Sequence, residues 1–322
     1  VADVEGTSTQ ASPVRLTTVE EARPPESASS PRWLLNLVLG GLIGLGLATA
    51  VAVLRDVLDT RIRSPHDVEL ATHHPVIGTI AFDARATDRP LVVHDAPHDF
   101  RAEAYRSLRT NLLFVEVEGG QRTFVVTSSV AGEGKTTATA NLAIALAQSG
   151  QTVLLIDADL RKPKVADTLG IEGRVGLTTV LIGDAEVDDA VQEWGGTGLF
   201  VLPAGRVPPN PSELLGSRAM ESLLRRLERE FDWILVDAPP LLPVTDAAVL
   251  ATRTSGAIVV AGSGKTTRGQ LESALARLGT VDARIAGILL TMLPTSAGHA
   301  SAYAYGYGYG PALPLDGVDD GP

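Results

Sequence analysis

Residues 124–137 read Phe-Val-Val-Thr-Ser-Ser-Val-Ala-Gly-Glu-Gly-Lys-Thr-Thr, which is an apolar strand, a turn of small residues and the start of a helix. The backbone N–H groups of such a turn, with the helix dipole behind them, form a nest for an anion. The segment approximates the phosphate-loop pattern G-x-x-x-x-G-K-[ST], although Ser129 stands where the pattern has its first glycine. Gly132 and Gly134 allow the backbone to wrap a phosphate. Lys135 is placed to reach the terminal phosphates of a nucleotide, and Thr136 to offer its hydroxyl to Mg²⁺.

A glycine turn that merely begins a helix is the alternative for this segment. The strand before it, the helix after it and the Lys-Thr pair in register favour nucleotide binding instead. We therefore predict a phosphate cradle formed by Ser129, Val130, Ala131, Gly132, Glu133, Gly134, Lys135, Thr136 and Thr137.

Two further apolar strands end in aspartates. Residues 153–159 read Val-Leu-Leu-Ile-Asp-Ala-Asp, and residues 233–240 read Trp-Ile-Leu-Val-Asp-Ala-Pro-Pro. In a doubly wound sheet the carboxyl ends of the strands converge on the ligand crevice, so Asp157, Asp159 and Asp237 are expected to face the metal and the phosphates. A lone aspartate at a strand end is usually a helix cap, but three of them beside a phosphate loop favour a site.

From residue 101 onward, apolar β-branched runs alternate with helical stretches. Because the runs are apolar on both faces and separated by helices, they predict an α/β domain with a doubly wound, mostly parallel sheet over residues 101–293. The predicted strands are 123–127, 152–156, 199–202, 233–236, 257–260 and 285–291, and the predicted helices are 136–149, 211–230, 244–252 and 267–278.

A second Gly-Lys-Thr sequence occurs at residues 262–267, which read Gly-Ser-Gly-Lys-Thr-Thr. Val259 occupies the position of the first glycine of the pattern, and no second pair of acid-ended strands accompanies the segment. We interpret it as a strand-to-helix turn rather than as a second nucleotide site.

Residues 33–54 carry no charge, and Asn36 and Thr49 are their only clearly polar members. A helix of this length extends roughly 33 Å, enough to cross the hydrocarbon core of a membrane. A buried core helix is the alternative, but such a helix is usually shorter and carries charge on one face. The segment therefore predicts one transmembrane helix, whose Gly40-x-x-x-Gly44 pattern would allow close helix pairing.

The segments flanking this helix differ in composition. Residues 1–32 are rich in Pro and Ser, cannot bury enough apolar surface to fold alone, and are expected to form an extracytoplasmic linker. Residues 55–100 are expected to form a juxtamembrane connector, helical over 55–63 and extended over 75–80. Arginines slightly favour a cytoplasmic C-terminal side, and a nucleotide site favours the same orientation because ATP is abundant inside the cell.

Composition narrows the function further. The 27 basic and 38 acidic residues give a net charge of −11, which argues against a protein whose main function is to bind nucleic acid. The absence of cysteine excludes disulfide scaffolds, thiolate metal sites and cysteine nucleophiles.

Residues 294–322 lack Lys and Arg and are expected to form a flexible tail. This tail holds four of the five tyrosines of the chain, Tyr303, Tyr305, Tyr307 and Tyr309. Ala and Gly spacers leave each phenol reachable as an acceptor, although a low-complexity tail without chemistry has the same composition.

With Lys135, Asp157, Asp159 and Asp237 in this order, the chain resembles the bacterial tyrosine kinases (BY-kinases). These are P-loop enzymes, related to the MinD/ParA-type ATPases, that phosphorylate themselves and govern capsule or exopolysaccharide export. Asp157-Ala-Asp159 is similar to the second Walker element of the family, and Asp237 to its Walker B aspartate. The resemblance implies that these four residues are catalytic, that the cofactors are ATP and Mg²⁺, and that Thr136, Asp159 and Asp237 hold the metal.

Other segments carry the same resemblance. Glu103-x-x-Arg106-x-x-Arg109 is similar to the oligomerisation helix of the family, and residues 208–215 to a recurrent loop. Helical spacing keeps the three charged residues on one face, where they can pair with a second copy in a ring, or pair among themselves on a solvated surface. Residues 24–60 resemble the last transmembrane helix of a polysaccharide co-polymerase that has the kinase fused behind it.

The resemblance also implies the reaction, the cellular location and the partners of the protein. It implies autophosphorylation of the tail tyrosines in trans by a ring of kinase domains on the cytoplasmic side of the inner or plasma membrane. The implied partners are the polysaccharide polymerisation and export machinery and a protein-tyrosine phosphatase, with no nucleic acid among them. Two alternatives stay open: a MinD/ParA-type membrane-associated ATPase, and an export regulator that binds ATP without turnover. Relatives of the first kind usually carry an extra lysine at the start of the phosphate loop, which residues 127–130 lack.

Overall fold

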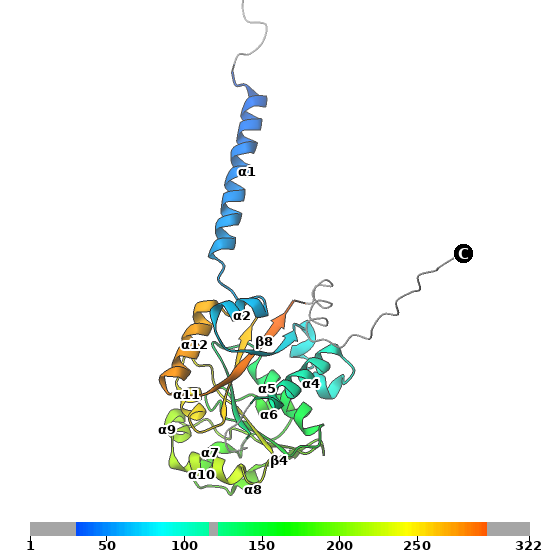
Figure 1. Cartoon of the computed structure of the whole chain (residues 1–322), viewed down its shortest axis with the longest axis vertical. Helices are drawn as coiled ribbons and strands as arrows, with labels where there is room; N and C mark the ends of the chain where they lie inside the picture. Colours follow the sequence, from blue (N-terminus) through cyan, green and yellow to red (C-terminus); the bar gives the residue numbers. More distant parts are fainter. Residues whose placement is uncertain (1–29, 116–121, 295–322) are drawn as a thin grey trace, which may run out of the picture. The chain divides into compact units, whose positions relative to one another are not determined.

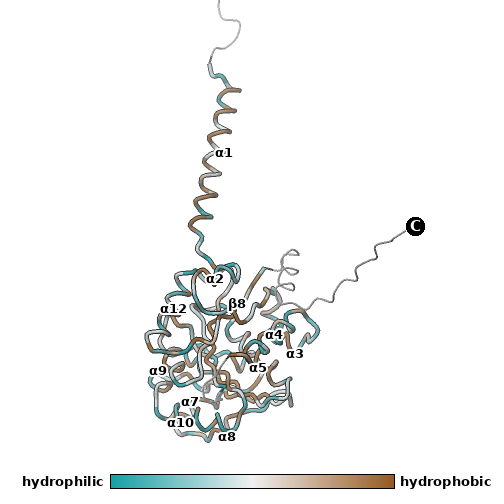
Figure 2. The backbone as a smooth tube through the Cα atoms, in the orientation of Figure 1, coloured by the Kyte–Doolittle hydropathy of each residue, from teal (hydrophilic) through white to brown (hydrophobic). Residues whose placement is uncertain are grey.

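The computed structural model describes residues 30–115 and 122–294, and the chain divides into two compact units, residues 1–59 and 60–322. In the first unit the helix α1 (Trp33–Leu58) has a mean hydropathy of 2.4 in its most apolar window, and none of its residues is buried. Apolar residues follow it along its length (Figure 2). It is long and apolar enough to cross a membrane, and it continues past the predicted end at residue 54.

The second unit is built on an eight-stranded sheet with the order β1-β8-β7-β2-β6-β3-β5-β4 (Figure 1). Neighbouring strands are parallel, except that β4 runs antiparallel to β5. The strands are β1 (Val76–Ala81), β2 (Thr123–Ser128), β3 (Val153–Asp157), β4 (Gln192–Trp194), β5 (Leu199–Leu202), β6 (Trp233–Asp237), β7 (Gly256–Gly262) and β8 (Ile285–Leu293).

Helices connect these strands. They are α2 (Pro65–Ala71), the 3-10 helix η1 (Ala84–Thr87), α3 (Val92–Asp95), α4 (Phe100–Leu113), α5 (Lys135–Ala147), α6 (Val165–Leu169), α7 (Leu177–Leu181), α8 (Val187–Ala190), α9 (Pro211–Leu215), α10 (Arg218–Leu227), α11 (Asp246–Ala251) and α12 (Arg268–Thr280).

Strand side chains are buried on both faces of the sheet. In β2, Val125 belongs to one apolar core, and Phe124 and Val126 belong to the other. Helices α2 and α7–α12 cover the first core, and α3–α6 cover the second (Figure 1). This arrangement confirms the predicted doubly wound, mostly parallel fold of the P-loop NTPase type.

The predicted connector over residues 55–100 differs from what the structure shows. Its extended run is β1, which pairs in parallel with β8 and therefore belongs to the sheet. The helix expected over 55–63 ends at Leu58, and Arg61 forms an antiparallel bridge with Thr267. The sheet thus begins before residue 101, because a six-residue strand gains its pairing from a segment about two hundred positions later in the chain.

The predicted helix 211–230 is also interrupted. It is two helices, α9 and α10, and the Ser217 side chain accepts a hydrogen bond from the N–H of Met220 at the start of α10. A hydroxyl that caps a helix in this way sets a new start, because it satisfies one of the N–H groups that the first turn leaves free. The short antiparallel strand β4 was not predicted.

Candidate functional site

The turn after the central strand β2 has the backbone of a phosphate cradle. Gly132 and Gly134 have φ values of 80° and 81°, in the left-handed region that residues with a side chain rarely adopt. Helix α5 starts directly after Gly134, at Lys135. The Ser129 hydroxyl, at the place of the first glycine of the pattern, is buried without a hydrogen-bond partner in the described part of the chain. A cradle with free polar groups and a helix start fits an anionic ligand.

Sheet order brings the acid-ended strands to this turn. β6 lies between β2 and β3, and Asp157 of β3 is the register partner of Asp237 of β6. Lys135 Nζ lies 2.7 Å from Asp237 Oδ1 and 3.8 Å from Asp159 Oδ2. The four side chains expected to be catalytic therefore meet at one edge of the sheet, as parallel strands require.

Hydroxyl groups of α5 complete the surroundings of the Asp237 carboxylate. Thr136 Oγ1 donates to Asp237 Oδ2 at 2.7 Å, and Thr139 Oγ1 lies 3.3 Å from Asp237 Oδ1. Thr139 was not predicted, although its position one helical turn after Lys135 was the available signal. Asp237 is fully buried, so its charge depends on these donors and on the Lys135 ammonium.

The oxygen atoms of Thr136, Asp159 and Asp237 are suitable ligands for Mg²⁺. In the described residues no three acidic or histidine side chains gather into a metal cluster of their own. Magnesium is usually held by one or two carboxylates together with waters and substrate phosphates, so this donor set fits the ion that the resemblance implies.

Burial changes the acidity of the two carboxylates of β3 and the loop after it. Desolvation, with the charge of Asp237 adding to it, raises the pKa of Asp157 to about 7. Desolvation also raises the pKa of Asp159, while the Lys135 charge acts in the opposite direction. Asp157 has no exposed surface, and its carboxylate accepts hydrogen bonds from the N–H groups of Asp159, Lys164 and Val165 at 3.1, 3.0 and 2.9 Å. A pKa near neutrality is typical of groups that transfer protons at a functional site.

An ion pair between an exposed arginine and a buried aspartate anchors the loop that carries Asp159. Arg161 Nε lies 2.8 Å from Oδ2 of Asp246, a fully buried carboxylate at the start of α11. Ser212 of the recurrent loop at 208–215 donates to Asp246 Oδ1 at 2.5 Å, and Arg161 also donates to the Ser212 hydroxyl at 3.0 Å. No local pattern in the sequence indicates this network of Arg161, Ser212 and Asp246, because its members are 34 to 85 positions apart.

The charged residues of α4 show the internal pairing that was the alternative to a ring contact. Arg106 pairs with Glu103 at 2.8 Å, and the Glu103 side chain is 67% exposed. Arg109 donates to the carbonyl of Ala145, near the end of α5, at 3.1 Å. The predicted acceptors Tyr303, Tyr305, Tyr307 and Tyr309 lie outside the described residues.

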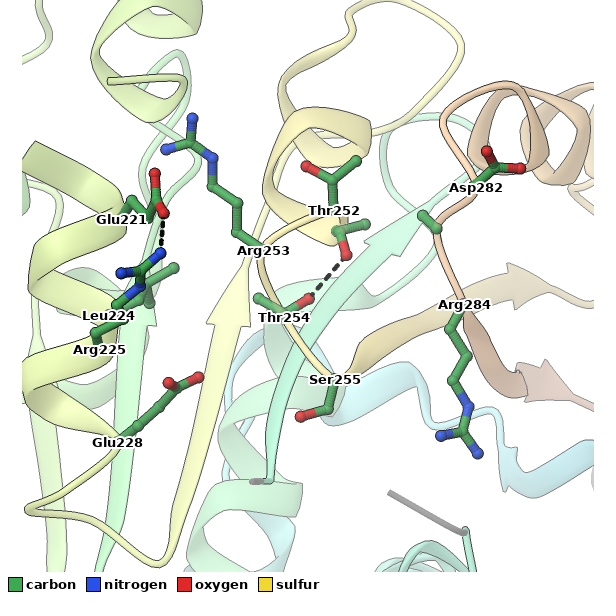
Figure 3. Close-up of a pocket in the computed structure, with 12 residues that line it drawn as sticks. Glu221, Leu224, Arg225, Glu228, Thr252, Arg253, Thr254, Ser255, Asp282 and Arg284 are labelled. Atoms are coloured by element: carbon green, nitrogen blue, oxygen red, sulfur yellow. Dashed lines mark hydrogen bonds and ion pairs between the residues drawn. The ribbon is translucent and has the colours of Figure 1, made fainter. Parts of the chain in front are cut away.

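A polar pocket elsewhere in this unit is not part of the site (Figure 3). Its lining includes Ser255 and Arg284, which directly precede β7 and β8, so it lies at the amino ends of the strands, opposite the phosphate cradle. Three of its charged residues are already engaged: Arg225 pairs with Glu221, and Arg253 donates to backbone carbonyls.

A family model and two named relatives are similar to this chain. A family model described as an AAA domain matches residues 121–280. The tyrosine-protein kinase YwqD of Bacillus subtilis strain 168 is 40% identical over 202 residues, which is 63% of this chain and 85% of that protein. The putative tyrosine-protein kinase EpsB of Ralstonia nicotianae is 32% identical over 88% of this chain, which spans only 40% of that longer protein.

A solved structure agrees with these relatives. The kinase domain of the Escherichia coli tyrosine kinase ETK superposes with a TM-score of 0.67 and 33% identity, covering 74% of this chain and 96% of that domain. The identity, the coverage and the shared fold lead to one conclusion: the chain belongs to the family of bacterial tyrosine kinases.

Proposed function

We propose that the chain is an ATP-dependent protein-tyrosine autokinase that phosphorylates the tyrosines of its C-terminal tail and regulates capsule or exopolysaccharide production and export. The observation that carries the proposal is the meeting of Lys135, Asp159 and Asp237 beside the phosphate loop. The names of the relatives support the reaction type, and the resemblance supports the polysaccharide role.

Each residue of the site has its own proposed role toward Mg-ATP. When bound, Mg-ATP supplies the phosphoryl group and a divalent charge. The Lys135 ammonium offers positive charge to the terminal phosphates, and Thr136, Asp159 and Asp237 would hold the metal. In the structure Lys135 is already fixed by Asp237 at 2.7 Å, so its ammonium is oriented before any ligand arrives.

Asp157 is proposed to orient the acceptor phenol and to take its proton on a carboxylate oxygen. A tyrosine has a pKa of about 10, and an ordinary carboxyl group has a pKa about six units lower, so proton transfer to such a carboxylate is strongly unfavourable. Burial raises the pKa of Asp157 to about 7, which roughly halves the difference between its pKa and that of the tyrosine. Asp157 has no exposed surface, and its carboxylate is hydrogen-bonded to the loop after β3, so a phenol reaches a remaining lone pair only when this loop shifts.

The assembly is proposed from the same resemblance. α1 anchors the chain in the inner or plasma membrane, and the kinase domain lies on the cytoplasmic side in a ring whose contacts include Glu103, Arg106 and Arg109. The tail of one copy is phosphorylated by its neighbour. Each phosphate adds about 1.5 to 2 negative charges, so we expect phosphorylation to dissolve the ring until a phosphatase restores it.

The experiment that tests the activity uses the purified chain of residues 1–322 in detergent with Mg-ATP, probed for phosphotyrosine. We expect a signal from the native chain, none from Lys135→Met, and none from the chain in which all four tail tyrosines are Phe. Arg225→Met, which removes an exposed arginine of α10, is the matched control and should keep the signal. A signal that survives in Lys135→Met would indicate a contaminating kinase and remove the proposal.

A mixing experiment separates trans from cis transfer. The Lys135→Met chain supplies acceptor tyrosines without activity, and the chain with four Phe substitutions supplies activity without acceptors. Phosphotyrosine on the Lys135→Met chain in the mixture supports transfer in trans. Nucleotide hydrolysis by the native chain without any phosphotyrosine would favour the ATPase alternative, and binding without turnover would favour the non-catalytic regulator.

A further inference from the structure

The second Gly-Lys-Thr sequence, at residues 262–267, makes its contacts with the first. It forms the turn between β7 and α12. Lys265 Nζ donates to the carbonyl of Gly132 at 2.8 Å, and Thr266 Oγ1 hydrogen-bonds to Glu133 Oε1. These two partners are neighbours in the phosphate loop, although they lie 133 positions earlier in the chain.

The backbone of this turn cannot form an anion nest of its own. The N–H groups of residues 263–266 all donate to protein carbonyls: Ser263 to Thr291, Gly264 to Ile62, and both Lys265 and Thr266 to Gly262. An anion site of the phosphate-loop type needs free N–H groups. The turn is therefore not a second nucleotide site, in agreement with its interpretation from the sequence.

Glu133 is the inner contact between the turn and the phosphate loop. Its side chain is fully buried, as is Thr266. Its carboxylate also accepts the N–H of Val130 at 3.0 Å, so it ties the first half of the loop to the second. The Thr266 hydroxyl accepts a hydrogen bond from the N–H of Gly262 at 2.8 Å, which leaves its hydrogen for Glu133. A buried carboxylate is costly without such partners.

Lys265 and Thr291 act on the carbonyls of the loop. Lys265 holds the carbonyl of Gly132, and Thr291 Oγ1 donates to the carbonyl of Glu133 at 2.7 Å. Because a trans peptide is planar, its N–H points opposite to its carbonyl. The N–H groups of Glu133 and Gly134 are thereby turned away from these two side chains, and in the described part of the chain neither donates to another backbone carbonyl. Because the carbonyls of Gly132 and Glu133 are held by Lys265 and Thr291, the N–H groups of Glu133 and Gly134 keep a fixed direction and can donate to an anion.

We propose that Lys265 and Thr266 are positioning residues for the phosphate loop: the turn between β7 and α12 fixes the loop in its anion-binding conformation. The inference rests on the proposed nucleotide site. Glu133 then has a role inside the phosphate loop, in addition to its predicted place in the cradle.

The test measures binding of a fluorescent methylanthraniloyl ADP by the chain of residues 1–322 in detergent with Mg²⁺. We expect Lys265→Met to raise the dissociation constant about tenfold, the loss of one hydrogen bond that involves a charged group. Thr266→Val loses its bond to Glu133 and also the bond from the Gly262 N–H, so we expect it to raise the dissociation constant at least about tenfold. Thr266→Ser keeps the hydroxyl and should restore binding to within about twofold of the native chain. Thr267→Val is the matched control, because the Thr267 hydroxyl only caps α12, by accepting the N–H of Gln270.

The salt dependence of binding separates positioning from direct contact with a phosphate. A lysine that neutralises a phosphate lowers the slope of affinity against salt when it is removed, whereas a positioning residue leaves that slope unchanged. Weaker binding by Lys265→Met alone, with a lower slope, would overturn the proposal in favour of direct contact. Native affinity in both variants, or an equal loss in Thr267→Val, would overturn it as well. A native chain that binds no nucleotide would refute the proposed function itself, which makes the two failures distinguishable.

Discussion

Asp157 is expected to make the stability of the metal-free protein depend on pH. Its carboxyl is fully buried at the end of β3, and burial together with the charge of Asp237 raises its pKa to about 7. Its ordinary value is 3.8. Between these two values the folded state keeps a proton that the unfolded state releases. The free energy of unfolding therefore falls as pH rises from about 4 to about 7.

The size of the effect follows from the two pKa values. Each unit of difference between the pKa values in the folded and unfolded states changes the free energy of unfolding by about 1.4 kcal/mol, once Asp157 is ionised in both states. Between pH 5 and pH 8, ionisation of Asp157 is expected to reduce the free energy of unfolding by about 3 kcal/mol. Asp157→Asn removes the titrating group and keeps one acceptor oxygen for the backbone N–H groups that the native carboxylate accepts.

The assay is urea unfolding of the native chain and of Asp157→Asn, in detergent with EDTA, at pH 5, 6, 7 and 8. Other titrating groups are shared by both chains, so the difference between the two free energies isolates Asp157. This difference should move in favour of the variant by about 3 kcal/mol from pH 5 to pH 8. A difference that stays constant within about 0.5 kcal/mol, the usual scatter of additive mutations, would mean that Asp157 is already ionised at pH 5, and the desolvation argument would be refuted.

Three further predictions concern other parts of the kinase unit. Arg161→Met leaves the buried Asp246 without its cation and should lower the free energy of unfolding by about 3 kcal/mol in urea titrations, and a loss under 1 kcal/mol would contradict this network. A Cβ added at Gly176 would lie 2.1 Å from the carbonyl oxygen of Pro203, so Gly176→Ala should destabilise by about 3 kcal/mol or more, whereas Gly269→Ala, in open space on α12, should stabilise by about 0.5 to 1 kcal/mol in the same assay. Glu103→Ala removes only an exposed pair and should change stability by less than about 0.5 kcal/mol, yet weaken ring assembly in sedimentation experiments; an unchanged assembly would exclude Glu103 from the interface.

Much of the fold could be predicted because its signals are local. The strands over 123–127, 152–156, 199–202, 233–236, 257–260 and 285–291 are all present, since each is a run whose residues are apolar on both faces. The strand that was not predicted, β4, is three residues long and only half-buried to exposed. β1 matches the extended run predicted over 75–80, but its pairing with β8 was not predicted.

The site was predictable to the extent that it follows from strand order. A phosphate loop and a strand that ends in aspartate are both recognisable from a few adjacent residues, and a parallel sheet brings their carboxyl ends together. The convergence of Lys135, Asp157, Asp159 and Asp237 could therefore be predicted. The contacts that hold them in place were not, because Thr139, Arg161 and Asp246 look like ordinary helix and loop residues.

The sequence by itself determined the apolar helix, the phosphate loop and the order of strands and helices, because backbone propensity and hydrophobic period act over a few neighbouring residues. Only the tertiary structure decided that the second Gly-Lys-Thr segment contacts the first. Their sequences are alike, but the N–H groups of one turn are used by protein carbonyls, and Lys265 points to Gly132. Hydrogen bonds between residues 133 positions apart leave no trace in local sequence, because they exist only once the sheet has placed β7 beside β2.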